Sequence, residues 1–245
     1  MIKKTKEKEK KTKSKSKKDF SALVPDLKEM LKEGVHFGHR SSKWNPKMKD
    51  YIFSVRNNVH IIDLEKTREK LLEALEFMDK LKQKDKTILF VGTKVAAKEI
   101  TKETAITCKM PYVTERWIGG SLTNFEAISG RLKYFRDLQN KKETGELKKY
   151  TKKEQHDFGV ELDKLRRRFG GIKESTKLPD ALLIVDVSKE QGAVKEAKAM
   201  SIPVIGLCDS NADPTMVDYP IPANDDAISS LKLILGIITK TLCQR

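Results

Sequence analysis

Residues 87–94 read TILFVGTK, an apolar run that stops at Gly92 and leads into a helical period ending at Thr107. An uninterrupted apolar run indicates a strand covered on both faces, because a strand with one face in water alternates apolar and polar residues. A covered strand that leads directly into a helix is the repeating unit of a parallel α/β sheet. This short stretch therefore predicts the class of the fold.

Apolar runs and helical periods continue to alternate on both sides of this stretch. Such alternation predicts an α/β fold, with a parallel sheet sandwiched by helices. The segment 36–50 is predicted to be irregular, because Gly38, Asn45 and Pro46 disfavour a regular element. Further strands are predicted at 51–55, 59–62, 112–113, 181–187 and 203–208, and helices at 26–33, 65–81, 94–107, 189–200 and 224–242.

One segment interrupts the alternation. An apolar stripe runs from Phe125 to Phe135 and a second from Phe158 to Phe169, each with spacings of three and four residues. Two such stripes joined by a polar turn around Gly145 predict an antiparallel helical hairpin, a coiled-coil arm with basic outer faces. The predicted organisation is a disordered Lys-rich tail at 1–20, an α/β domain formed by 21–121 and 171–245, and the hairpin insert at 122–170.

Charge is distributed unevenly along the chain. The 245 residues carry a formal net charge of +15, and residues 1–18 hold ten Lys and two Glu. Residues 36–68 hold seven Lys or Arg against three acids, whereas residues 180–245 hold six against nine. This segregation favours a protein with one face on a polyanion over a general effect of lysine on solubility. The tail has too little apolar area to fold alone and is predicted to be flexible.

The cysteines and the hydropathy indicate the compartment. Cys108, Cys208 and Cys243 are odd in number and far apart, which argues against a disulfide framework and favours a reducing environment. No apolar run approaches the roughly 20 residues that cross a bilayer, and the N-terminus lacks the apolar stretch of a secretion signal. We therefore expect no membrane association.

A parallel α/β sheet raises the alternative of a nucleotide-binding enzyme. The turn at Gly92-Thr93-Lys94 follows a strand and opens a helix, which resembles half of a phosphate-binding loop. A Walker loop needs four residues between its glycines and then Lys-Ser/Thr, so that successive amides cradle the phosphates. This turn has a single glycine, and the chain contains no GxGxxG. An ordinary strand-to-helix turn is the preferred interpretation, and no enzymatic activity is expected.

Two weak metal candidates remain open. His36 and His39 are separated by two residues, which on a helix would place both rings on one face as a metal site can require. Contacts to phosphate or ribose, or ordinary packed histidines, are the preferred interpretation. The loop from Asp209 to Asp213 begins like a calcium loop, but prolines replace the glycine and the bidentate glutamate that an EF-hand requires. No cofactor is expected beyond a candidate structural divalent ion at these residues.

Cations and aromatic residues are interleaved in the segment 36–68. Lys and Arg neutralise phosphates, Asn amides reach sugars or base edges, and an exposed aromatic ring stacks on an unpaired base. A second cluster is RWIGG at 116–120, whose two glycines allow close backbone approach. Trp117 is equally compatible with a core position. The predicted RNA-binding residues are Lys43, Trp44, Asn45, Lys47, Lys49, Arg56, Asn57, Arg68, Lys94, Arg116, Arg166, Arg167 and Arg168.

Short blocks along the chain resemble, in order, the motifs of the bacterial small-subunit ribosomal protein two family. The resemblance covers about residues 24–242. The blocks are GVHFGH at 34–39, WNPKM at 44–48, NVHIIDLEKT at 58–67, LFVGTK at 89–94, RWIGG at 116–120, LTN at 122–124, GGI at 170–172, LPDAL at 178–182, IPV at 202–204, DSNADP at 209–214 and IPANDDAI at 221–228.

This resemblance implies a flavodoxin-like fold with an inserted helical hairpin and no catalytic role. It implies a place between head and body of the small subunit, contact with small-subunit rRNA and neighbouring proteins, and help in docking the large messenger-binding ribosomal protein one. A monomer bound to ribosomes in the bacterial cytosol or an organelle is expected. The Lys-rich tail is an addition to the short N-terminus that is usual in this family, so the resemblance implies no role for it. A regulatory RNA-binding module outside the ribosome remains the alternative.

Overall fold

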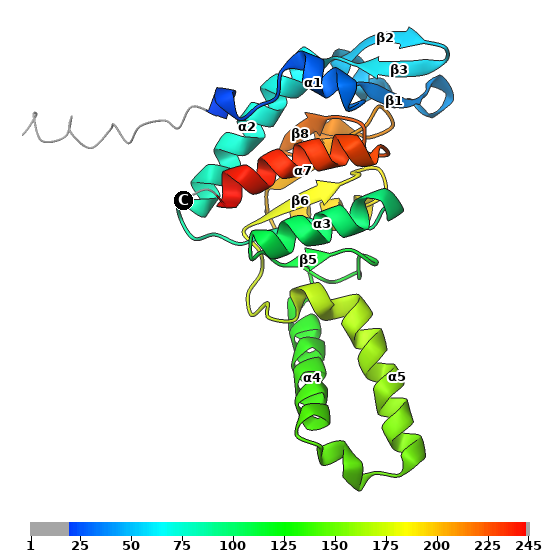
Figure 1. Cartoon of the computed structure of the whole chain (residues 1–245), viewed down its shortest axis with the longest axis vertical. Coiled ribbons are helices and arrows are strands. Elements are labelled where there is room, and N and C mark those ends of the chain that lie inside the picture. Colours follow the sequence, from blue (N-terminus) through cyan, green and yellow to red (C-terminus); the bar gives the residue numbers. More distant parts are fainter. Residues whose placement is uncertain (1–19, 244–245) are drawn as a thin grey trace, which may run out of the picture.

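A parallel sheet forms the centre of the computed structural model, which describes residues 20–243 (Figure 1). Within this described part the sheet has five strands in the order β5-β4-β6-β7-β8, and all neighbours are parallel. Numbered by appearance in this sheet, the order is 2-1-3-4-5, which is the flavodoxin-like arrangement. The predicted fold class is confirmed. The strands are β4 (Ile88–Val91), β5 (Tyr112–Val113), β6 (Ala181–Val185), β7 (Val204–Cys208) and β8 (Tyr219–Pro222).

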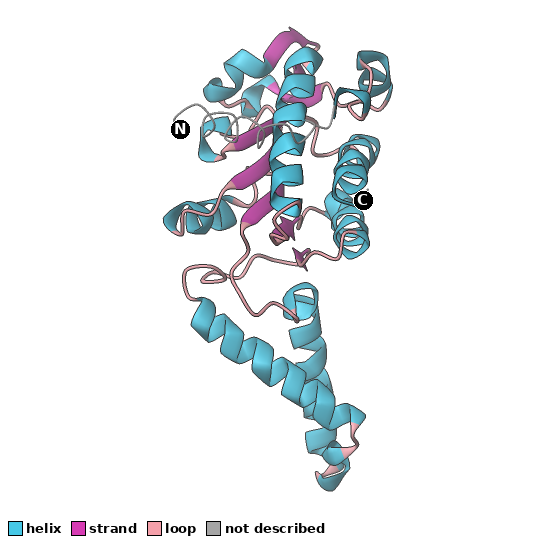
Figure 2. Ribbon diagram, turned by 90° about the vertical axis from the view of Figure 1, so that its left-hand side faces the viewer, coloured by secondary structure: helices cyan, strands magenta, loops and turns pink. Residues whose placement is uncertain are grey.

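Helices cover the sheet on both faces (Figure 2). Side chains that alternate along β4 and β6 point to opposite sides: Phe90 and Leu183 pack into one core, whereas Leu89 and Leu182 pack into the other. Burial on both sides explains why these strands are continuous apolar runs. The first core is closed by α1 (Leu27–Lys32), α2 (Leu64–Lys82), α3 (Val95–Thr107) and α7 (Ile228–Cys243), and the second by α6 (Gln191–Ala199) and the base of the hairpin insert.

A separate antiparallel sheet corrects the sequence prediction for residues 36–62. The predicted strands exist as β2 (Ile52–Arg56) and β3 (Val59–Ile62), but they pair with each other instead of joining the parallel sheet. Asn57 and Asn58 join them with φ angles of 50° and 60°, as a tight hairpin turn requires. The supposedly irregular part contains β1 (Phe37–Arg40), which completes the order β1-β3-β2, and the 3-10 turns η2 (Ser41–Lys43) and η3 (Pro46–Tyr51).

The helical hairpin is confirmed as α4 (Phe125–Glu143) and α5 (Lys152–Phe169), joined through η4 (Glu146–Lys149). The turn uses Gly145 at φ 77°, a left-handed conformation that glycine adopts without strain. A capping box between Thr151 and Glu154 starts α5. The arm projects away from the sheet at the end opposite the β1–β3 sheet (Figure 1). Its helices are held together by Ile128, Leu132, Phe135 and Leu138 on α4 and Leu162, Leu165 and Phe169 on α5.

Several element boundaries differ from those predicted. The strand β8 was missed because Pro220 and Pro222 are unusual in strands, and β8 is an edge strand where proline is tolerated. The helix predicted from residue 224 begins at Ile228, because the Asn224 side chain accepts the backbone N–H groups of Asp226 and Ala227. Of the tail at 1–20, only Phe20 lies within the described residues, and it is buried against the core as the start of η1 (Phe20–Ala22).

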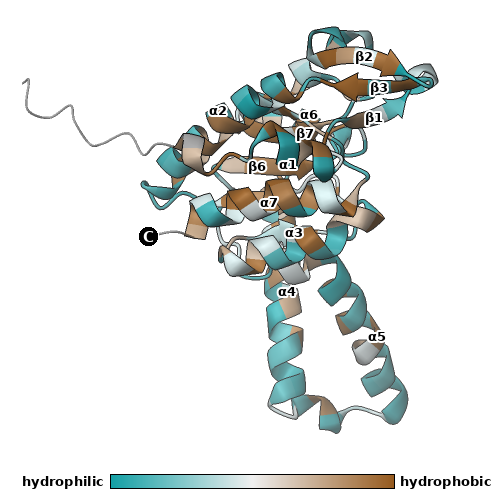
Figure 3. Ribbon diagram, turned by 45° about the horizontal axis from the view of Figure 1, so that its top comes forward, coloured by the Kyte–Doolittle hydropathy of each residue, from teal (hydrophilic) through white to brown (hydrophobic). Residues whose placement is uncertain are grey.

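Hydropathy follows this architecture. The sheet strands and the inner faces of the helices are apolar, and the outer faces of the arm are polar (Figure 3). Among the helices described here, none combines the length and the apolar character needed to cross a membrane.

Candidate nucleic-acid interface

The first group of predicted RNA-binding residues lies around the small antiparallel sheet. Lys43, Lys49, Arg56 and Asn57 are exposed on η2, η3 and the β2–β3 turn. Buried Met48 anchors η3, which leaves the flanking lysines in solvent. We call this region, formed by residues 37–62, the N-terminal sheet surface.

Three predicted members of this surface have structural partners. The half-buried Trp44 ring stacks on His60 at a centroid distance of 5.1 Å, so one of its faces is already covered. The Asn45 side chain accepts the Lys47 backbone N–H at 3.1 Å, as an N-cap of η3. The Lys47 ammonium lies 2.6 Å from Asp213 Oδ2 and is partly neutralised.

Phe53 was not singled out from the sequence, although it is the more exposed aromatic ring. Its side chain is 76% exposed on β2, next to Val55 at 54%, and Phe37 is 50% exposed on β1 of the same sheet. Much of the β2 ribbon carries the colour of apolar residues in Figure 3. An exposed phenylalanine among cations suits stacking on an unpaired base. The sequence of β2 carried no signal for this, because apolar and polar residues do not alternate along it and all its residues after Ile52 are exposed.

The second basic group lies where the arm joins the sheet. The exposed Arg166, Arg167 and Arg168 end α5 and line a hollow of about 370 Å³ together with Lys98 and Lys102 of α3. Glu99 and Glu115 are its acidic members, and Glu115 Oε2 lies 3.1 Å from Lys98 Nζ. We call this region the arm-root hollow. Neither α3 lysine was predicted, because only the fold brings α3 next to the end of α5.

Arg116 is exposed on the loop that runs from β5 to α4, the first helix of the arm. This loop is held by Glu196 of α6, a residue that the sequence did not indicate. The carboxylate accepts Trp117 Nε1–H at 3.0 Å and the backbone N–H groups of Gly120 at 2.9 Å and Leu122 at 3.0 Å. Burial would raise the pKa of Glu196, but these donors outweigh it and lower the pKa below its usual value.

Lys94 has a different environment from the other predicted cations. Its ammonium lies 2.7 Å from Asp225 Oδ1, 2.6 Å from Asp226 Oδ1 and 3.5 Å from Asp186 Oδ2. Burial alone would lower the pKa of Lys94, but the bonds to Asp225 and Asp226 outweigh this effect and raise it. We therefore group Lys94 with these carboxylates. Arg68, the last predicted residue, is exposed on α2.

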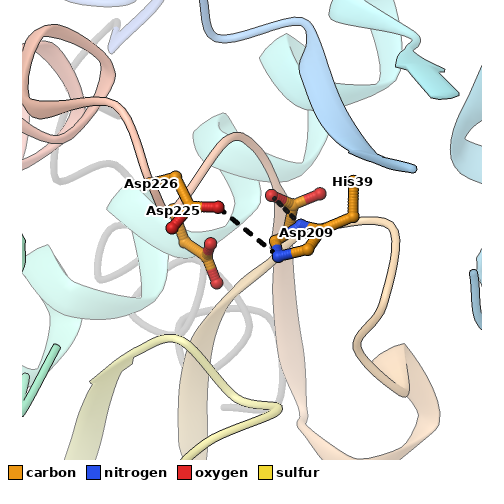
Figure 4. A group of neighbouring side chains, drawn as sticks. All are labelled: His39, Asp209, Asp225 and Asp226. Atoms are coloured by element: carbon orange, nitrogen blue, oxygen red, sulfur yellow. Dashed lines mark ion pairs between the residues drawn. The ribbon is translucent and has the colours of Figure 1, made fainter. Parts of the chain in front are cut away.

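His39, Asp209, Asp225 and Asp226 form a compact group at the carboxyl edge of the sheet, which we call the acidic cluster (Figure 4). His39 Nδ1 lies 2.9 Å from Asp209 Oδ2, and His39 Nε2 lies 3.4 Å from Asp226 Oδ2. The Asp209 contact raises the pKa of His39 against a smaller opposing effect of burial. Burial, with nearby Asp186 and Asp209, raises the pKa of Asp225 to about 7.

Only two of the four metal candidates predicted from the sequence lie in the acidic cluster. His39 and Asp209 are brought together, whereas Asp213 pairs with Lys47 and the His36 ring packs on Phe37 at 4.0 Å. The predicted pairing of His36 with His39 fails because residues 37–40 form a strand, which points side chains three apart to opposite faces. Asp225 and Asp226 were missed, because the β8 strand that delivers them was not predicted.

In nucleotide-binding proteins whose sheets have this strand order, the ligand binds in a crevice at the carboxyl ends of the strands that correspond to β4 and β6. Side chains of this chain occupy that place. Thr93 Oγ1 donates to the buried Glu190, and Lys189 Nζ donates to the Thr93 carbonyl at 3.2 Å. The turn at Gly92 holds the helix close to the strand, since a side chain there would collide with Thr101. This geometry fits the interpretation of an ordinary strand-to-helix turn.

Comparisons with known proteins point to one family over most of the chain. Residues 30–244 match the family model described as ribosomal protein S2. Proteins named small ribosomal subunit protein uS2 are similar to this chain in Hahella chejuensis, at 50% identity over 84% of this chain and 82% of the relative, and in Coprothermobacter proteolyticus, at 47% over 90% and 82%. A protein of Cyanophora paradoxa named small ribosomal subunit protein uS2c is 45% identical over 90% of this chain and 95% of the relative.

Proposed function

The chain belongs to the ribosomal protein S2 family, and on that premise we propose that it is a structural constituent of the small ribosomal subunit that binds ribosomal RNA between head and body. Its relatives are named as proteins of that subunit. Its place is on ribosomes, in the cytosol or in an organelle, and its partners are rRNA and neighbouring small-subunit proteins. No catalytic role is proposed.

The main support for RNA binding is the arm-root hollow. Five cationic side chains surround it against two acids, and the three arginines at the end of α5 are exposed to solvent. Arginine forks match phosphate oxygens bidentately, which makes such a cluster suitable as a phosphate site. The N-terminal sheet surface adds cations and an exposed phenylalanine on the far side of the parallel sheet from the arm (Figure 1). Two basic surfaces on one scaffold suit a ligand that is long, folded and polyanionic.

Incorporation into the subunit tests this proposal. A tagged copy would be expressed in a bacterium beside the untagged protein, and its share in small subunits measured after sucrose-gradient sedimentation and a moderate salt wash. We expect about one copy per subunit, and a severalfold lower share for the variant Arg166→Ala/Arg167→Ala/Arg168→Ala. The control Lys28→Ala/Lys32→Ala/Lys84→Ala removes the same charge from exposed positions outside both surfaces and should incorporate normally.

Two outcomes would contradict the proposal. Wild-type protein found only at the top of the gradient would remove the structural role, and the free regulatory module would then be favoured. Equal loss in the arginine variant and the lysine control would mean that general charge, and not the arm-root hollow, determines binding. Titration calorimetry with ATP and GTP tests the enzyme alternative, for which we expect no heat of binding.

Docking of the large messenger-binding ribosomal protein one is the second part of the proposal. Its support is the family resemblance of the sequence, and no surface of this chain is assigned to it. Small subunits depleted of this chain should retain less of that protein after a salt wash, and adding back the chain should restore it. Full retention without this chain would refute the docking role.

A further inference from the structure

The acidic cluster joins three parts of the chain that are distant in sequence. His39 belongs to β1 of the small sheet, Asp209 follows β7, and Asp225 and Asp226 follow β8. We propose that the acidic cluster is a binding site for one divalent transition-metal ion, of which zinc fits best, and that the ion fixes the small sheet to the edge of the parallel sheet. This inference is independent of RNA binding.

The charges of the cluster support a cation. Asp209 and Asp225 are each 1% exposed, and the buried Asp186 adds a third carboxylate beside them. With Asp226, four carboxylates gather here: three contact the Lys94 ammonium, and Asp209 contacts the His39 imidazole, which Asp226 also contacts. Buried carboxylates of like charge are unfavourable unless cations pair with them. Lys94 cannot neutralise this group alone.

A buried oxygen without a partner points to where the ion would bind. Asp225 uses Oδ1 to accept Lys94, whereas its Oδ2 has no hydrogen-bond partner among the described residues and is closed to solvent. An orphaned carboxylate oxygen in the interior is costly and requires an explanation such as an ion. Figure 4 shows the Asp225 carboxylate turned toward His39 and lying beside Asp226, so the carboxylate that holds this oxygen faces into the cluster.

The donor set selects the class of metal. The four residues offer one imidazole nitrogen and three carboxylate oxygens, all within 4.8 Å of one another. Ligand bonds of about 2.0–2.2 Å around zinc require donors roughly 3–4 Å apart, so modest side-chain rotation closes the site. A histidine ligand favours zinc and its neighbours over magnesium and calcium, which prefer oxygen alone. Lys94 can keep its bonds to the Oδ1 atoms of Asp225 and Asp226, which leaves both Oδ2 atoms for the ion.

Titration calorimetry of the full chain with ZnCl2 tests the site, after removal of any affinity tag and treatment with a chelator. All proteins would carry Cys108→Ser/Cys243→Ser, since these two sulfurs lie 3.1 Å apart and could bind zinc themselves. The test variants are Asp225→Asn and His39→Gln. The matched controls are Asp213→Asn and His36→Gln, which change the same residue types nearby but outside the cluster. Circular dichroism would verify that each variant is folded.

The parent is the chain that carries only Cys108→Ser/Cys243→Ser. We expect it to bind one zinc ion, both test variants to bind zinc at least tenfold more weakly, and both controls to bind zinc as the parent does. Zinc should also raise the thermal midpoint of the parent but not of the test variants. Magnesium at the same concentration should bind at least tenfold more weakly. Zinc binding that is absent from the parent, or equal in the parent and Asp225→Asn, would overturn the proposal in favour of a network of Lys94 and protonated His39. If Asp225→Asn is unfolded, the His39→Gln result decides alone.

Discussion

Glu196 shows how one side chain outside the candidate surfaces determines the shape of a loop within them. Its two oxygens accept an indole N–H and several backbone N–H groups of the loop that carries Arg116. No local pattern around residue 196 indicates this role, because the donors lie more than 70 positions earlier in the chain. A residue whose partners depend on tertiary structure is found only in the fold.

Replacing Glu196 by Gln should destabilise the protein by about 1–3 kcal/mol at pH 7, the usual loss for charge-assisted hydrogen bonds. Because folding lowers the pKa of Glu196, the carboxylate contributes stability above its unfolded pKa, and this contribution is lost as pH falls through the folded pKa. Urea titrations should therefore show a gap between wild type and variant that narrows as pH falls from about 5 toward 3. The control Glu103→Gln, at an exposed position, should show no gap.

Gly171 is required for close packing and not for an unusual φ angle. A Cβ atom there would overlap the carbonyl oxygen and ring of Tyr112, where the arm meets β5. Because a backbone oxygen cannot move aside cheaply, Gly171→Ala should destabilise the fold by about 1–3 kcal/mol. Gly119→Ala is the matched control, since a Cβ atom at that position would have no described atom within 4 Å apart from its own chain neighbours. Equal thermal midpoints for the two variants would disprove this account.

At the scale of elements, the arm is stabilised mainly by contacts within itself. Phe135 is 1% exposed between the two helices, and Tyr134 Oη donates to Glu161 Oε2 at 3.1 Å across them. Phe135→Ala should lower the free energy of unfolding of the arm by about 3–5 kcal/mol. Hydrogen exchange should then accelerate over 125–143 and 152–169 while β4, β6 and β7 remain protected. Lys133→Ala, at an exposed position of α4, should leave exchange unchanged. Loss of protection throughout the sheet would show that arm and sheet unfold together.

Helices with a strong period and strands with an unbroken apolar run could be predicted from the sequence, whereas strands interrupted by glycine or proline could not. The stripes of α4 and α5 and the apolar runs of β4, β6 and β7 carry their own signal, and all were predicted. β1 and β8 were missed, since a glycine in β1 and two prolines in β8 interrupt the apolar pattern by which strands are recognised. A different limit applied to the sites: exposed cations were identifiable by type, whereas Lys98, Lys102, Asp225 and Asp226 required the fold.

At the scale of the whole molecule, two basic surfaces on opposite sides of the parallel sheet predict strongly salt-dependent RNA binding. Each phosphate contact releases condensed counterions, which contributes about 0.7–0.9 to the slope of log affinity against log salt. Arg56→Ala/Arg116→Ala/Arg167→Ala should therefore flatten the slope by about 2–3 in filter binding to small-subunit rRNA. Arginines are chosen here because Lys47 and Lys94 already contact carboxylates. An unchanged slope would show that these arginines do not contact RNA.

The position of the arm also affects the order in which the chain can fold during synthesis. β4 and β6 are hydrogen-bonded neighbours at the centre of the sheet, with Ile88 opposite Ala181, and the whole arm is synthesised between them. Because synthesis proceeds at roughly 5–20 residues per second, β4 emerges from the ribosome about 5–20 s before β6. During that interval an apolar strand has no neighbour on one edge, while the arm, whose contacts are local, can already fold. The insertion thus delays closure of the sheet and exposes the nascent chain to aggregation just before its core is complete.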